Sequence, residues 1–136
     1  MAVPFNKFNS FVEAMAHEKH NLSSDTLQVA LTNTAPVAGN AVLADLTQIS
    51  YTNLSSRVLT TSSSGQTSGV YKLVIADLVL TASGAVAPFR YVVIFNQTAS
   101  NDELIGWFDY GSSITLANGD TFTIDFDGSN GVLTLT

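Results

Sequence analysis

The sequence lacks cysteine and has few basic residues, and each absence excludes a class of chemistry. Without cysteine the chain forms no disulfide, no thiolate metal site and no cysteine nucleophile. Five Lys and Arg residues stand against eleven Asp and Glu residues, which gives a net charge of −6. The five cations are scattered along the chain, whereas binding to nucleic acid needs a continuous basic surface. The sequence therefore predicts no direct contact with nucleic acid.

Long apolar runs are absent too. No stretch approaches the roughly 20 apolar residues that span a bilayer as a helix. The first residues, MAVPFNKFNSF, lack the basic segment and the following apolar run of a signal peptide. We therefore expect no membrane partner and no secretion, with the chain made in the cytoplasm of the cell that produces it.

The common catalytic motifs are missing as well. There is no Gly-X-Ser-X-Gly motif, and no glycine-rich phosphate loop follows a predicted strand. His17 and His20 flank Glu18, but a metalloprotease helix places its histidines four residues apart with Glu directly after the first. We interpret both histidines as residues of a helix C-terminus, where they complement the helix dipole. The expectation is that the chain is not an enzyme.

Acidic residues occur in two segments that invite a chemical interpretation. Asp102 and Glu103 in a turn, with Asp109 on the next strand, suggest a glycosidase carboxylate pair, although acidic rims are common in β-proteins. The segment DFDGSNG, residues 125–131, offers oxygen atoms to calcium but lacks the Glu that completes an EF-hand loop. Asp and Asn beside Gly are also typical of hairpin turns. We favour the turn and expect no metal and no cofactor.

Alternating apolar residues in the second half of the chain predict short antiparallel strands. Residues 91–95 are apolar on both faces, which indicates a central strand covered on two sides. Residues 121–126 are apolar at every second position, as a half-exposed strand is, and TLQVALT, residues 26–32, has the same pattern. Turn residues such as Asn118-Gly119 separate the strands. The predicted fold class is mainly β, an antiparallel β-sandwich or barrel-like fold with one N-terminal α-helix.

The N-terminal segment, residues 4–19, has helical spacing instead. Its apolar residues recur at intervals of three and four, and Pro4 suits the first turn of a helix. Two interpretations stay open: the helix covers the sheet, or it docks on a neighbouring subunit. The candidate contact residues of this helix are Phe5, Phe8, Phe11, Val12 and Met15.

Two polar connections are the other candidate contact segments. Residues 33–53 are too long for an ordinary connection, and such excursions are often functional. The tip SSSGQTSG, residues 62–69, joins two predicted strands and is either flexible or ordered on assembly. The candidate contact residues of these segments are Val37, Val42, Leu43, Leu46, Tyr51, Ser64 and Gln66.

The length of 136 residues suits one domain with one substantial core. We expect a single β-rich domain over residues 1–136, with the helix at about 4–19, the β-core at about 25–136 and the excursion at about 33–53. A surface rich in Ser and Thr and poor in charge favours contact with other proteins. Assembly into a homo-oligomer is therefore part of the prediction.

Three stretches resemble a family of short structural proteins of tailed-phage virions. They are HNLSSDTLQVALTNTAPV, YKLVIADLVLTASGAVAPFRYVVIFN and LIGWFDYGSSITLANGDTFTIDFDGSNGVLTLT. The resemblance covers nearly the whole chain and rests on strand and turn motifs, so it identifies no site residues. It implies a capsid decoration protein, also called a cement protein, on the outside of the bacteriophage head. Such a subunit would bind the major capsid protein and bridge its neighbours, with a homotrimer as the favoured assembly.

Two alternatives accompany this expectation. One is another structural part of the virion, such as a tail or head-completion subunit. The other is a carbohydrate- or cell-surface-binding module in which Tyr51, Trp107 and Tyr110 stack on sugar rings. A buried Trp107 favours the structural role, whereas an indole facing solvent favours binding to sugar.

Overall fold

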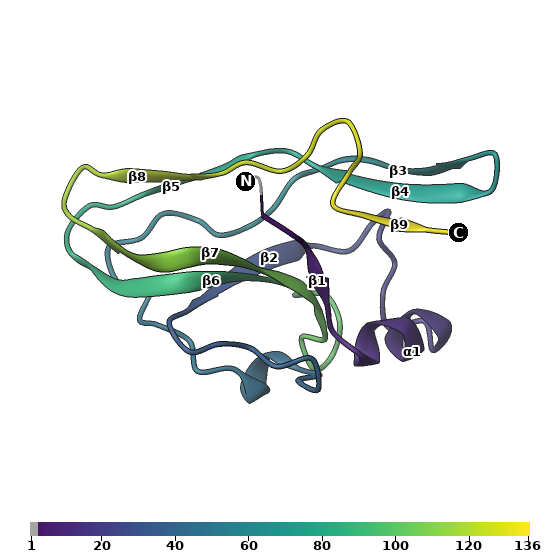
Figure 1. Ribbon diagram of the computed structural model, residues 1–136, viewed down its shortest axis with the longest axis horizontal. Helices are drawn as coiled ribbons and strands as arrows, with labels where there is room; N and C mark the ends of the chain where they lie inside the picture. The colour runs from purple at the N-terminus through teal and green to yellow at the C-terminus, as the bar shows by residue number, and fades with distance from the viewer. Residues whose placement is uncertain (1–2) are drawn as a thin grey trace.

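The computed structural model describes residues 3–136, which form three antiparallel sheets and one short α-helix (Figure 1). The predicted mainly β fold is confirmed. The elements are β1 (Asn6–Lys7), α1 (Ser10–Ala16), β2 (Leu27–Thr32), a 3-10 helix (Leu43–Asp45), β3 (Thr61–Thr67), β4 (Val70–Ile75), β5 (Leu78–Thr81), β6 (Val86–Asn96), β7 (Leu104–Leu116), β8 (Thr121–Ile124) and β9 (Leu133–Leu135).

The strands form two layers. One layer is the four-stranded sheet β1-β7-β6-β2, and the other contains the three-stranded sheet β3-β4-β9 and the pair β5-β8 (Figure 1). The main core fills the space between the layers, with Phe89 and Ile94 from β6 and Leu73 from β4 fully buried in it. Burial of this amount of apolar surface is the principal driving force for folding.

The four-stranded sheet is covered on its second face as well. Here Ala30, Val93, Phe95 and Leu104 form a smaller buried cluster with Phe8. The prediction of two covered faces for residues 91–95 is therefore confirmed for Val92 to Phe95. The prediction that residues 26–32 form a half-exposed strand is wrong for β2, in which five of the six residues are buried.

The N-terminal helix is shorter than predicted. Residues 4–19 do not form one helix, because Asn6 and Lys7 pair with Trp107 and Gly106 of β7 and so remain extended. The α-helix begins at Ser10 and ends at Ala16, and Glu18 then adopts a left-handed conformation with φ of 58°. Helical spacing of apolar residues does not exclude a short strand, since Phe5 and Phe8 reach the core from either conformation.

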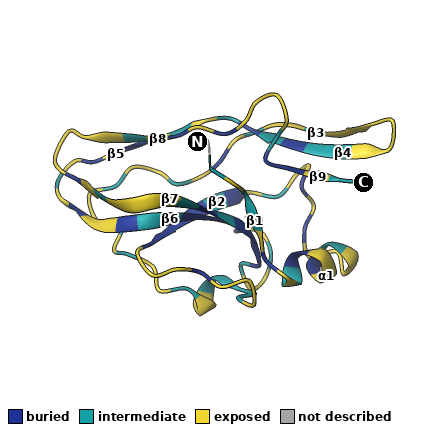
Figure 2. Ribbon diagram, viewed as in Figure 1, coloured by how far each residue is buried: buried dark blue, intermediate teal, exposed yellow. Residues whose placement is uncertain are grey.

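The strands around SSSGQTSG are longer than predicted. Most of this segment belongs to β3, and the connection is reduced to the turn Ser68–Gly69, whose φ angles are 52° and 83°. Two positive φ angles are typical of the type I′ turn, which matches the twist of a hairpin. The resulting β3–β4 hairpin reaches one end of the molecule, where its tip is exposed (Figure 2).

Candidate functional site

The N-terminal apolar stripe belongs to the protein's own core. Phe8 and Phe11 are 0% and 1% exposed, and Phe5 packs against Phe108 with ring centroids 5.6 Å apart. Phe8 lies on Trp107 of β7 at 4.5 Å. Only Val12, which is 52% exposed, faces solvent in this set. Burial of the Phe residues favours the interpretation in which the helix covers the sheet, because these side chains are unavailable to a partner.

The excursion between β2 and β3 is mainly a cover for the sheet. Leu43 and Leu46 pack against the smaller cluster. Val42 pairs through its backbone with Glu103 and is half-buried. Val37, at 59% exposed, is the large apolar side chain that this segment presents to solvent. Most of the predicted contact residues of residues 33–53 thus have an internal packing role.

Tyr51 is also engaged within the chain. Its hydroxyl accepts the backbone N–H of Leu31 at 3.0 Å and donates to Gln48 Oε1 at 2.7 Å. The guanidinium of Arg57 lies over its ring, 3.5 Å from the centroid. Burial raises the pKa of this phenol above its ordinary value. Tyr51 and Arg57 therefore close the outer edge of β2 rather than offering a free aromatic surface.

The β3–β4 hairpin carries the remaining candidates, Ser64 and Gln66. Ser64 Oγ hydrogen-bonds with the hydroxyl of Tyr71 at 2.7 Å, and Gln66 Oε1 accepts the backbone N–H of Gly69 at 3.0 Å. Most residues of β3 are exposed, and Val70 beside the turn is 40% exposed. The hairpin is thus an ordered polar projection, and its side chains stabilise the turn.

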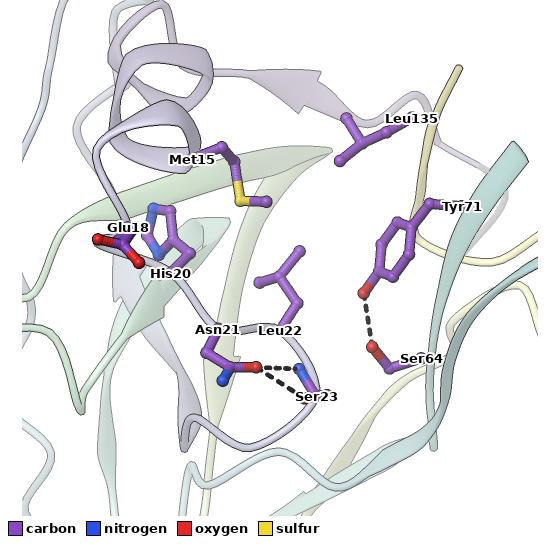
Figure 3. A pocket seen from close by; sticks show the side chains of 9 residues that line it. All are labelled: Met15, Glu18, His20, Asn21, Leu22, Ser23, Ser64, Tyr71 and Leu135. Carbon is purple, nitrogen blue, oxygen red and sulfur yellow. Dashed lines mark hydrogen bonds between the residues drawn. The ribbon is translucent and has the colours of Figure 1, made fainter. Parts of the chain in front are cut away.

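A pocket of about 510 Å³ lies between this hairpin and the segment that follows α1 (Figure 3). Met15 and Leu22 line one side, and Tyr71 and Leu135 line the other. The pocket also borders Glu18, His20, Asn21, Ser23 and Ser64. Its lining is therefore mixed, with apolar side chains such as Met15, Leu22 and Leu135 beside polar ones such as Asn21 and Ser64.

A buried polar cluster fixes the chain beside this pocket. Asn96 at the end of β6 is fully buried, and its amide nitrogen donates to Asp25 Oδ2 at 2.6 Å and lies 3.0 Å from His20 Nδ1. Its oxygen accepts the backbone N–H groups of Thr98 and Ala99. These two acceptor contacts fix the orientation of the amide, so a hydrogen bond between Asn96 and His20 requires Nδ1 to be the acceptor. Asn96 therefore ties the connection between α1 and β2 to the sheet.

The prediction that His20 belongs to a helix C-terminus is wrong. The helix ends at Ala16, and His20 is buried at 6% exposure, with its ring 5.4 Å from that of Phe11. Burial lowers the pKa of His20, while the nearby carboxylates of Glu103 and Asp25 oppose this effect. His20 Nε2 has no hydrogen-bond partner within residues 3–136. The sequence signal for this cluster was Asn96 itself, a polar residue directly after an apolar run.

The acidic residues considered for a glycosidase pair do not converge. Asp109 forms a two-bond ion pair with Arg90, at 2.8 Å and 3.0 Å. Glu103 precedes β7 and lies about six strand residues away, which corresponds to roughly 20 Å. Carboxyl groups of glycosidases are about 5–9.5 Å apart. The arrangement therefore gives no support to this pair.

The segment DFDGSNG forms a turn. Asp127 accepts the backbone N–H groups of Ser129 and Asn130 through Oδ1, and the side-chain amide of Asn130 through Oδ2. These hydrogen bonds, led by the one from the Asn130 backbone, lower the pKa of Asp127. Both carboxylate oxygens are thus used by the turn. No group of three or more potential metal-ligating side chains occurs in the part of the chain that the structure describes.

The three aromatic residues considered for sugar stacking do not form one surface. Trp107 is half-buried against Phe8 in the smaller cluster, whereas Tyr110 packs on Phe122, which borders the main core. Trp107 and Tyr110 therefore face opposite sides of β7, as residues three apart on a strand do. Tyr51 is covered by Arg57. This geometry disfavours the sugar-binding alternative.

The basic residues are largely used within the protein. Arg57 donates to the carbonyl of Val29, Arg90 pairs with Asp109, and Lys72 Nζ donates to the carbonyl of Ser129 at 2.8 Å. The chain as a whole carries a net charge of −6. No helix in residues 3–136 is long and apolar enough to cross a membrane.

Comparisons with known proteins add no relative: no family model, no curated protein and no solved structure matches the chain. The site thus has to be interpreted from its own geometry. That geometry has three parts: a projecting uncharged hairpin, a pocket beside it, and the exposed residues Val12 and Val37.

Proposed function

We propose that this chain is a structural protein of a tailed-phage virion, a decoration subunit that binds the outside of the head and bridges neighbouring capsid proteins. Its role is mechanical: it holds adjacent capsid subunits together against the outward pressure of the packaged genome. The proposal gives it no catalytic step and no cofactor. The resemblance of three stretches, residues 20–37, 71–96 and 104–136, motivates this choice.

The observation that carries the proposal is the β3–β4 hairpin. It presents an ordered, exposed strand of Ser, Thr, Gly and Gln residues, and no charged residue occurs between Arg57 and Lys72. β9 pairs with Tyr71–Leu73 of β4, on the side of the hairpin away from β3, so the edge of β3 and the turn remain exposed. In a protein whose function is to bind other proteins, this exposed strand provides a contact surface.

The small exposed apolar residues fit the same role. Val12 and Val37 are small exposed side chains, so each can contribute a modest apolar contact. Many modest contacts repeated over a shell give strong attachment through multivalency. The negative charge of the subunit also suits a basic patch on the capsid exterior.

Electron cryomicroscopy of purified particles that contain this chain tests the position. Density for a two-layer β-fold on the shell exterior, at the junctions between capsid proteins, is the expected result. Density at the tail or at the portal vertex contradicts the decoration role and favours the alternative structural positions.

A second experiment tests the mechanical role. Particles that lack the chain are heated beside particles to which the purified protein has been added back, and release of DNA is followed by a fluorescent dye. We expect the temperature of DNA release to rise on addition of the protein. An unchanged release temperature with the protein bound would show that reinforcement is the wrong mechanism.

A further inference from the structure

The outer edge of β3 has no partner within residues 3–136. In the order β3-β4-β9, the backbone of Thr61–Thr67 hydrogen-bonds to β4 alone. The edge of β2, by contrast, is covered: Val29 N donates to Arg57 O, and Ile49 N donates to Leu31 O, both at 3.0 Å. The other sheet-edge strands are shorter: β1 and β9 contain two and three residues, and β5 and β8 contain four each. β3 is thus the long edge that the fold leaves open.

This edge also lacks the usual protection against pairing. Soluble proteins guard edge strands with charged residues, Pro, bulges or covering segments. Residues 63–67 contain no charge and no Pro, and the register shift of the hairpin lies before them, between Thr61 and Ser63. Five consecutive residues are therefore free to form a regular ladder with another strand.

The distribution of charge along the chain indicates which strand pairs with β3. Copies of this chain carry a net charge of −6 and repel one another over most of their surface. The β3–β4 hairpin adds nothing to that repulsion, since residues 58–71 hold no ionisable acid or base apart from the Tyr71 phenol. A second copy can therefore approach through β3 when it cannot approach through an acidic surface.

We propose that β3 pairs with β3 of a second copy, antiparallel and across a twofold axis centred on Gly65. This register places Ser64 opposite Gln66 and Ser63 opposite Thr67 of the second copy, so each pair can form hydrogen bonds across the strands. Gly65 is opposite itself, and a Cβ added there meets nothing within 4 Å, so a side chain at this position has room on the face of the sheet. The two three-stranded sheets then become one continuous sheet.

A ladder of this length buries little surface. Interfaces well below about 1,200 Å² are weak. We therefore expect a concentration-dependent equilibrium between monomer and dimer in solution, and a populated dimer where copies are concentrated. The inference concerns the chain alone, so it stands or falls independently of the proposed virion role. It also replaces the trimer expected from the sequence with twofold symmetry.

Cysteine cross-linking provides the test, because the chain has no cysteine of its own. In the proposed pair the two Cα atoms at position 65 lie about 4.5–5.5 Å apart, which a disulfide can bridge. Gly65→Cys is expected to form a covalent dimer under mild oxidation, and a reductant should reverse it. Thr67→Cys is the matched control on the same exposed strand, because its two copies would lie roughly 14 Å apart.

We expect about tenfold more dimer from Gly65→Cys than from Thr67→Cys at equal concentration, since only the first pair meets disulfide geometry. Equal cross-linking of the two variants, or none of Gly65→Cys at about 1 mM, would overturn the proposal. A trimeric mass of the unmodified chain in sedimentation experiments would overturn it as well.

Charge substitution gives an independent measurement. The double variants Ser63→Asp/Thr67→Asp and Ser63→Lys/Thr67→Lys place like charges opposite each other, so each alone should lose dimer in sedimentation. A mixture of the two should recover it as a mixed dimer. Thr121→Asp/Thr123→Asp adds the same charge on exposed positions of β8 and should leave dimerisation nearly unchanged. Failure of the mixture to associate more than either variant would contradict β3 pairing.

Discussion

The side-chain amide nitrogen of Asn96 on β6 lies 3.0 Å from His20 Nδ1, and this contact favours the neutral imidazole because an amide nitrogen can only donate. The same amide nitrogen donates to Asp25, so one side chain joins the end of the sheet to two residues of the α1–β2 connection. Protonation of His20 would place a hydrogen on Nδ1, where it would face a hydrogen of the Asn96 amide.

The first prediction concerns pH. Burial lowers the pKa of His20 in the folded state below its ordinary value of 6.5, so the unfolded chain binds the proton more readily. The contribution of neutral His20 to stability is therefore complete above pH 6.5, and it is lost as the pH falls through the folded-state pKa. We expect His20→Gln to have a weaker dependence of melting temperature on pH than the unmodified chain between about pH 8 and about pH 5.

The second prediction concerns Asn96. Asn96→Leu leaves the amides of Thr98 and Ala99 without their acceptor and removes a donor from Asp25. Loss of several partly buried hydrogen bonds should lower the free energy of unfolding by about 2–4 kcal/mol, as measured by urea denaturation. Asn33→Ala, which removes one exposed hydrogen bond to Ser113, should change it by less than about 0.5 kcal/mol. Equal effects of both substitutions would show that the cluster is not a specific anchor.

The third prediction concerns close packing of β1 on β7. A Cβ at Gly106 would overlap the ring of Phe5 and lie 2.7 Å from the carbonyl oxygen of Asn6. Gly106→Ala should therefore displace the N-terminal strand and cost about 1–3 kcal/mol in the free energy of unfolding. Gly65→Ala is the control, since its Cβ meets open space and should cause no loss. If Gly106→Ala is also neutral, β1 does not pack on β7 as described.

The strand pattern was predictable because it depends on local alternation. The run Val92–Phe95, apolar on both faces, is indeed a central strand, and Asp127 forms the turn that Asp and Asn beside Gly predict. The extended Asn6–Lys7 was not predictable, because its conformation depends on pairing with β7, about a hundred residues away. Only the three-dimensional arrangement shows that the excursion covers a sheet face.

The roles of the candidate contact residues likewise depend on the three-dimensional arrangement. Phe8 and Phe11 were candidates because they are apolar, but apolar character alone does not distinguish a core side chain from an interface side chain. The open edge of β3 had no sequence signal of its own, since Ser, Thr and Gly residues are as typical of loops as of uncharged strands. Strand order had to be known before the edge could be recognised.

The fourth prediction concerns the excursion as a cover. Leu46→Ala removes a half-buried side chain from the smaller cluster and should lower the free energy of unfolding by about 1–2 kcal/mol. Thr47→Ala, at the next exposed position, should change it by less than about 0.5 kcal/mol. Urea denaturation of the two variants measures both values. A neutral Leu46→Ala would instead favour an excursion that acts mainly as a contact loop.

The fifth prediction distinguishes an effect on binding to the capsid from an effect on the stability of the fold. Val12 and Val37 are the predicted contact residues whose apolar side chains are most exposed, at 52% and 59%. Substituting either with Asp removes no core packing, so the melting temperature should change little. If these residues touch the capsid, each Asp would bury an unpaired charge in the interface and weaken binding by about tenfold or more.

Binding of the purified variants to particles that lack the chain, measured by co-sedimentation, gives the comparison. Thr123→Asp, on an exposed position of β8, adds the same charge away from both residues and serves as the reference. Equal affinity of all three variants would exclude Val12 and Val37 from the interface, and the hairpin would then be the first surface to substitute.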